Sequence, residues 1–175
     1  VFWIKQENEN WVKNNPEIAL NIQTETYKYP SVNIIGKIEG TDPQLKKEYV
    51  LLSGHQDHDG IRHPVKNDTI YNGADDNAST CVAMLAMARA YNKEPSKRSI
   101  LFVIHGAEER GLLGSRWHAA HPVVPKESIV AVLNGDMIGR NDNNEAALLG
   151  GDAPHKNSEE LVKMALDANN ESTKF

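Results

Sequence analysis

The sequence lacks three features that would each place it in a particular class of protein. Its only cysteine, Cys81, excludes an internal disulfide and a zinc site built from cysteines alone. Its apolar runs, such as residues 129–133, are far too short to cross a bilayer. It has no basic excess, because 19 Lys and Arg stand against 24 Asp and Glu and leave a formal net charge of −5. We therefore expect no membrane span and no nucleic-acid partner.

The 175 residues are enough for one domain with a sizeable core. The chain opens with Val1 rather than methionine, so we expect an excised piece of a longer protein. The absence of a targeting signal then says nothing about its compartment.

Apolar periodicity predicts strands that alternate with helices. A half-buried strand is expected at 17–23, with 32–38 as its hairpin partner. Wholly apolar strands follow at 49–52, 99–104 and 129–133. Helices are expected at about 78–91 and 112–121, and a capping box of Asn157 and Glu160 predicts the start of a third helix. This alternation predicts a three-layer α/β/α fold with a mixed, mainly parallel central sheet. We expect residues 1–30 to form a lead-in segment with the first strand, and residues 31–175 to form the domain proper.

Each wholly apolar strand leads directly into residues that bind metals or protons. These are His55 and Asp57 after the first, Glu108 and Glu109 after the second, and Asp136 after the third. In open α/β sheets the binding crevice lies at the carboxyl ends of the strands, so we expect these groups to converge there. Asp75 and Asp76, at the start of the first predicted helix, would join them.

Gathering so many carboxylates in one crevice requires a positive partner, since like charges repel and raise one another's pKa. No Lys or Arg cluster occurs at these strand ends, and imidazole with carboxylates but no thiolate suits zinc. Taken singly, each motif also has a structural explanation: a surface hydrogen bond, a helix cap or a solvated loop. For four further histidines, His58, His63, His105 and His155, the sequence leaves open whether they belong to the site or have a structural role. It also predicts an irregular loop over 55–74.

Four strings, in this order, resemble metallopeptidase family twenty-eight: YVLLSGHQDHDG, IYNGADDNAS, ILFVIHGAEERGLLGSR and VLNGDMIGR. The resemblance implies a phosphorylase/hydrolase-like fold and two co-catalytic zinc ions. It implies that His55 and Asp136 bind one zinc, Asp75 bridges both, Glu109 binds the other, Glu108 is the general base and Asp57 orients His55. It also implies a cis peptide bond between Asp75 and Asp76.

The implied activity is that of an aminopeptidase acting on peptides with a free N-terminus, through a metal-activated water and Glu108. Two alternatives stay open: a glutaminyl-cyclase-like zinc acyltransferase, and a non-catalytic binding domain on a peptidase scaffold. The resemblance implies an extracellular or periplasmic protein. Substrate residue preference and oligomeric state are left open.

The chain departs from the family pattern in two places. Thr80 stands where the family often has glycine. The family's fifth metal ligand, a histidine, lies downstream of the Asp136 motif, and the chain reaches Phe175 without it. We therefore expect residues 31–175 to be a partial zinc peptidase domain in which the Glu109 position lacks one ligand and binds zinc weakly.

Overall fold

The computed structural model describes residues 4–15, 17, 19–26, 28–140, 145, 147–149 and 158–172. Asn157 and His155, named above, lie outside the described residues. The chain divides into two compact units, residues 1–30 and 31–175.

The described residues of the first unit include one short helix, α1 (Glu9–Asn14), preceded by a helical turn at Gln6–Asn8. The described residues from 17 to 26 form no helix or strand, and Leu20 and Ile22 are both exposed. The strand predicted at 17–23 is therefore wrong. Alternation gives one face of a strand its apolar character, but a strand is stable only when it has a partner and a covered face.

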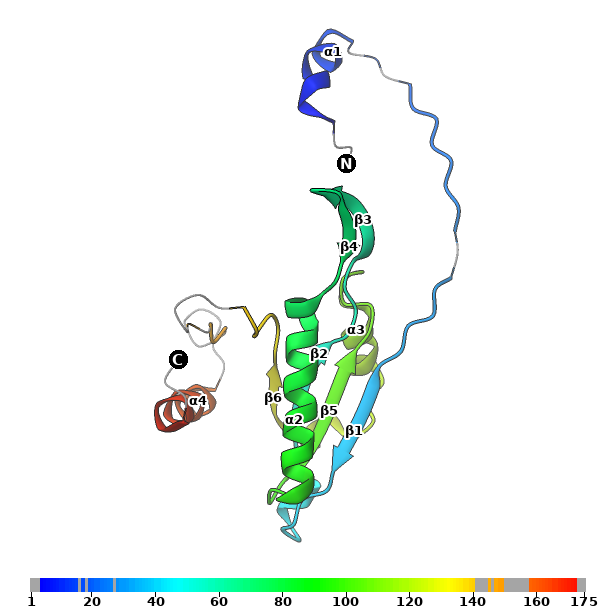
Figure 1. The fold of residues 1–175 in the computed structure, drawn as a ribbon. Helices are drawn as coiled ribbons and strands as arrows, with labels where there is room; N and C mark the ends of the chain where they lie inside the picture. Colours follow the sequence, from blue (N-terminus) through cyan, green and yellow to red (C-terminus); the bar gives the residue numbers. More distant parts are fainter. Residues whose placement is uncertain are drawn as a thin grey trace. The chain divides into compact units, whose positions relative to one another are not determined.

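The second unit is built on a four-stranded sheet in the order β1-β5-β2-β6 (Figure 1). Its strands are β1 (Ile34–Ile38), β2 (Tyr49–His55), β5 (Ser99–His105) and β6 (Ile129–Asn134). β2 runs parallel to both β5 and β6, whereas β1 is antiparallel to β5. The mixed, mainly parallel sheet is thus confirmed, and the predicted hairpin is wrong because β1 takes β5 as its partner.

The two faces of the sheet carry separate apolar cores because successive side chains of β5 point to opposite faces. Ile100 and Phe102 pack with Met84 of α2 (Thr80–Lys93), which covers one face of the sheet. Leu101 and Val103 pack with Leu51 on the other face. Helix α3 (Leu113–Ala120) lies on that second face, where its side chains line a cavity together with Leu51. Helix, sheet and helix therefore form the three predicted layers.

A two-stranded hairpin, β3 (Gly60–Val65) and β4 (Asp68–Tyr71), occupies most of the stretch that we expected to be irregular. Its turn residues Lys66 and Asn67 have φ of 49° and 71°, as a tight hairpin turn of the type I′ class requires. Nearly all of its residues are exposed, so no pattern of apolar residues on one face marks it in the sequence.

The last described element is α4 (Glu159–Ser172), near the predicted start of the third helix. The Oγ of Ser158 accepts a hydrogen bond from the amide of Leu161 at 3.4 Å, across its first turn. No helix among the described residues combines the length and apolar character needed to span a membrane.

The start of α2 lies directly against the ends of two strands, and this contact positions the site. A Cβ on Gly54 or on Gly135 would come within 2.7 Å of the methyl carbon of Thr80. Glycine at both positions therefore makes room for the buried Thr80 side chain. The packing brings the helix start next to His55 and Asp136, which follow these glycines.

Candidate metal centre

His55 is the last residue of β2, and only 4% of its surface is exposed. Its Nδ1 lies 2.9 Å from the carbonyl oxygen of Asp57. Because a carbonyl only accepts, Nδ1 carries the hydrogen and donates it, which leaves Nε2 of the neutral ring free. The Sγ of Cys81 in α2 donates to the carbonyl of His55 at 3.1 Å, so strand end and helix are tied together here.

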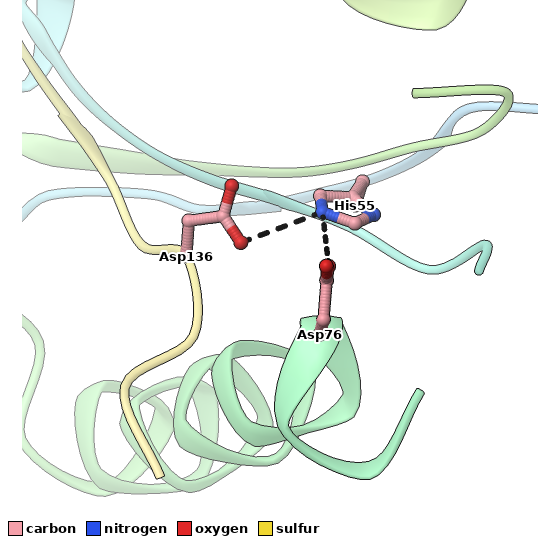
Figure 2. A group of neighbouring side chains, drawn as sticks. All are labelled: His55, Asp76 and Asp136. Atoms are coloured by element: carbon pink, nitrogen blue, oxygen red, sulfur yellow. Dashed lines mark ion pairs between the residues drawn. The ribbon is translucent and has the colours of Figure 1, made fainter. Parts of the chain in front are cut away.

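A first cluster of possible ligands surrounds the Nε2 of His55. This atom lies 3.2 Å from Asp76 Oδ1 and 3.5 Å from Asp136 Oδ1, and Glu108 Oε2 is 4.0 Å away. Figure 2 shows the two aspartates approaching the ring from different segments, Asp76 from the helix start and Asp136 from the segment after β6. Burial acts to lower the pKa of His55, but the Asp57 carbonyl and the nearby carboxylates outweigh it and raise this pKa.

A second cluster shares Asp76 with the first. Its other oxygen, Oδ2, lies 3.7 Å from the Nε2 of His58, and Glu109 Oε1 lies 3.6 Å from the same nitrogen. His55, Asp76 and Asp136 thus form one group of metal-ligand type, and His58, Asp76 and Glu109 form the other. Burial raises the pKa of Glu109, and the neighbouring charges of Asp76 and Asp59 raise it further.

The structure places Asp76 where we expected Asp75. The backbone at Asp76 (φ −100°, ψ 88°) is not helical, so the two adjacent aspartates do not follow helical spacing. Asp75 instead accepts a hydrogen bond from the amide of Gly139 through its Oδ1, at 2.8 Å. The cis peptide bond also lies one residue further on, between Asp76 and Asn77, and the predicted position is wrong.

Asp75 belongs to a set of side chains that hold the segment after β6. Ser79 Oγ accepts from the amide of Ile138 at 3.2 Å. The buried Asn77 donates to the carbonyl of Gly135 at 3.0 Å and accepts from the amide of Met137 at 3.3 Å. These contacts from the helix start lie on both sides of Asp136, so they fix the residue that faces His55.

The carboxylate of Asp57 positions the two glutamates rather than the His55 ring. Its Oδ1 accepts from the amide of Glu108 at 3.0 Å, and its Oδ2 accepts from the amide of Glu109 at 3.2 Å. The same Oδ1 is 3.9 Å from His55 Nδ1, beyond hydrogen-bond distance. The orienting contact to His55 that we expected from the Asp57 carboxylate comes from its backbone carbonyl.

A cavity of about 700 Å³ adjoins the first cluster. His55, Glu108 and Asp136 line it on the cluster's side, and its remaining lining is largely apolar and includes Leu51, Pro122, Ile129 and Val132. His105 and His118 also line it; both are buried, with ring centroids 5.7 Å apart.

The donor set fits zinc. Each group offers one imidazole nitrogen and two carboxylates whose ligand atoms lie within 4.8 Å of one another, and nitrogen and oxygen donors of this kind are what zinc accepts. Within the described part of the chain, no Lys or Arg forms an ion pair with these carboxylates. A bound divalent cation would neutralise the negative charge that these carboxylates bring together.

Comparison with known proteins gives aminopeptidases, vacuolar membrane proteases and a glutaminyl cyclase among the similar chains. The probable leucine aminopeptidase of Arthroderma otae is 28% identical over 170 residues, which cover 93% of this chain and 44% of that protein. The crystal structure of a Zn-dependent exopeptidase from Parabacteroides distasonis is 30% identical with a TM-score of 0.51, over 61% of this chain and 41% of that one. Glutaminyl cyclase from Bacteroides thetaiotaomicron matches over 81% of this chain and 52% of its own, with a TM-score of 0.63, but at 22% identity this likeness shows the fold alone.

The chain thus spans less than half the length of the Arthroderma relative. The family model of Peptidase family M28 matches residues 33–174, which include every residue of both clusters. This chain belongs to Peptidase family M28.

Proposed function

We propose that the protein is a zinc-dependent aminopeptidase that hydrolyses N-terminal peptide bonds. The observation that carries this proposal is the position of Asp76, whose two carboxylate oxygens face two separate groups of ligand-type side chains. A carboxylate shared in this way suits a pair of metal ions rather than a single one.

Both metal positions would be formed by residues of this chain, with Asp76 common to the two. His55, Asp76 and Asp136 would hold one zinc, and Asp76 with Glu109 would hold the second. Bound zinc supplies a water of lowered pKa and polarises the carbonyl that is to be attacked.

Glu108 is the group that moves the proton. Its carboxylate lies beside the first cluster, 4.0 Å from His55 Nε2, and belongs to neither ligand group. Asp57 holds its backbone amide, which keeps the side chain at the edge of the site. We propose that Glu108 takes a proton from the attacking water at a carboxylate oxygen and then hands it to the nitrogen of the departing amine.

The charge and shape of the site favour a substrate with a free N-terminus. The carboxylates of Asp76, Asp136 and Glu108 would attract a protonated α-amine of a peptide. The adjoining cavity, lined largely by apolar side chains, would accept an apolar N-terminal residue. By family resemblance, we also propose an extracellular or periplasmic location.

Two other functions compete with this one. The glutaminyl cyclase shares the fold, but the pair of glutamates at 108 and 109 and the shared Asp76 favour a peptidase with two metal positions. A non-catalytic binding domain is disfavoured because ligand-type side chains are present at both positions.

The test compares aminopeptidase and cyclase assays in the zinc-loaded protein. We expect release of the anilide from leucyl anilide and no cyclisation of a glutaminyl peptide. Glu108→Gln should lower kcat about 10²- to 10⁴-fold, with zinc content unchanged. The matched control, Glu127→Gln, alters a glutamate outside both clusters and should leave kcat unchanged. Equal turnover by Glu108→Gln and the parent would remove Glu108 as the base, and cyclisation alone would favour the acyltransferase.

A further inference from the structure

We infer that His58 is a protein ligand of the second metal position, binding through Nε2 together with Asp76 and Glu109. This inference rests on the proposed function, since it names a further residue of the same centre. It also replaces our expectation that the Glu109 position lacks a ligand from this chain.

The distances around His58 suit a shared ion better than direct hydrogen bonds. Its Nε2 lies 3.7 Å from Asp76 Oδ2 and 3.6 Å from Glu109 Oε1, and a side-chain hydrogen bond is not formed at such lengths. Two ligand atoms on one tetrahedral zinc, each bonded at 2.0–2.2 Å, lie roughly 3.4 Å apart. The distances from His55 Nε2 to its two aspartates, 3.2 and 3.5 Å, fall in the same range.

The hydrogen bond at the other ring nitrogen prepares Nε2 for a metal. The Nδ1 of His58 lies 3.1 Å from the carbonyl oxygen of Tyr71, which only accepts, so Nδ1 carries the hydrogen. In the neutral ring the lone pair then sits on Nε2 and points at two carboxylates. A metal ion between this lone pair and the carboxylates would bind all three groups. His55 has the same arrangement, with the carbonyl of Asp57 at its Nδ1.

The surroundings also hold the His58 ring in place. The ring stacks on Tyr71 with the centroids 6.3 Å apart and the planes 25° from parallel. Gly73, with φ of 67°, lies where a Cβ would come within 2.6 Å of both the His58 Cβ and the Asp76 carbonyl oxygen. Glycine at this position therefore allows His58 to approach the segment that carries Asp76. The β3–β4 hairpin provides this support, because it begins just after His58 and returns through Tyr71.

The test is a zinc titration of the metal-free protein by calorimetry, with three single variants. We expect the parent to bind two zinc ions. His58→Ala should weaken one of them at least tenfold and leave the other within about threefold, whereas His55→Ala should weaken the other. His63→Ala is the matched control, because this exposed histidine of β3 belongs to neither cluster, and its titration should match the parent's.

A second measurement keeps the inference testable if His58→Ala does not fold. Nitrogen-15 NMR of the histidine rings in the parent should show the Nε2 of His58 shifting on zinc addition, while the His63 ring does not shift. Zinc binding that is lost in His55→Ala but unchanged in His58→Ala, with no shift at His58, would overturn the inference and leave the proposed function standing. No zinc binding by the parent would overturn both.

Discussion

The most informative substitution is Asp57→Asn, because each carboxylate oxygen of Asp57 has its own backbone amide to hold. Oδ1 accepts from Glu108 and Oδ2 accepts from Glu109. Asparagine has one oxygen and one amino group, so whichever way it turns, it can accept from one of these amides and points a donor at the other. The variant therefore loses one charge-assisted bond and weakens the second.

The size of the effect follows from these contacts. A hydrogen bond to a charged group contributes about 1.5–3 kcal/mol, and an amide left facing a donor adds its own cost. We expect Asp57→Asn to lower the free energy of unfolding by about 2–3 kcal/mol. Because the lost bond holds the segment that carries the proposed base, the same variant should lower kcat while zinc still binds at His55, Asp76 and Asp136.

Asp42→Asn is the matched control. The Oδ1 of Asp42 alone accepts from two amides, those of Gln44 and Leu45, at 2.9 Å each. Asparagine keeps that oxygen and both hydrogen bonds, so the control should lose less stability than Asp57→Asn. Urea denaturation gives both free energies of unfolding, and hydrogen exchange at the amides of Glu108 and Glu109 locates the effect. The reasoning is refuted if Asp57→Asn leaves both the exchange of these amides and the stability unchanged.

Three further predictions concern the core, a tightly packed glycine and a buried histidine. Leu101→Ala removes a side chain that is 1% exposed and should cost about 3 kcal/mol of unfolding free energy in urea denaturation; a loss below about 1 kcal/mol would contradict its place in the core. Gly114→Ala puts a Cβ 2.2 Å from the carbonyl oxygen of Gly106 and should cost about 3 kcal/mol, whereas Gly36→Ala meets nothing within 4 Å and should be tolerated on steric grounds. Burial lowers the pKa of His118, so the unfolded chain binds its proton more readily and stability falls as the pH drops below about 6.5. His118→Gln should make that acid-side decline shallower when denaturation is followed across pH, and an unchanged slope would rule out this cause.

The strand ends were predictable because a wholly apolar strand that runs into His, Asp or Glu is a strong signal. In a parallel sheet the carboxyl ends of such strands meet at one edge, and the structure brings His55, Glu109 and Asp136 close to a common aspartate for this reason. The choice between Asp75 and Asp76 was not predictable from the residues. Both are aspartates at the start of a helix, and only the non-helical backbone at Asp76 decides which one faces the cluster.

Two other features depend on contacts that sequence patterns do not record. The ring of His58 is oriented by the backbone carbonyl of Tyr71, the last residue of β4. The hairpin that contains Tyr71 has exposed strands, so no alternation of buried and exposed residues marks it in the sequence. The strand predicted at 17–23 has the alternation of a strand, but alternation gives no information about a pairing partner. Periodicity thus predicts elements that are buried by a sheet or helix, and misses both exposed strands and ring orientations.

The central claim is that the carboxylate of Asp76 is shared by two metal positions. Its most direct test is a crystal structure of the zinc-loaded protein, with the anomalous signal collected at the zinc absorption edge. We predict two anomalous peaks, one beside Asp76 Oδ1 facing His55 and Asp136, and one beside Oδ2 facing His58 and Glu109. Zinc bound through Asp75, or anomalous peaks remote from the Asp76 carboxylate, would contradict the claim.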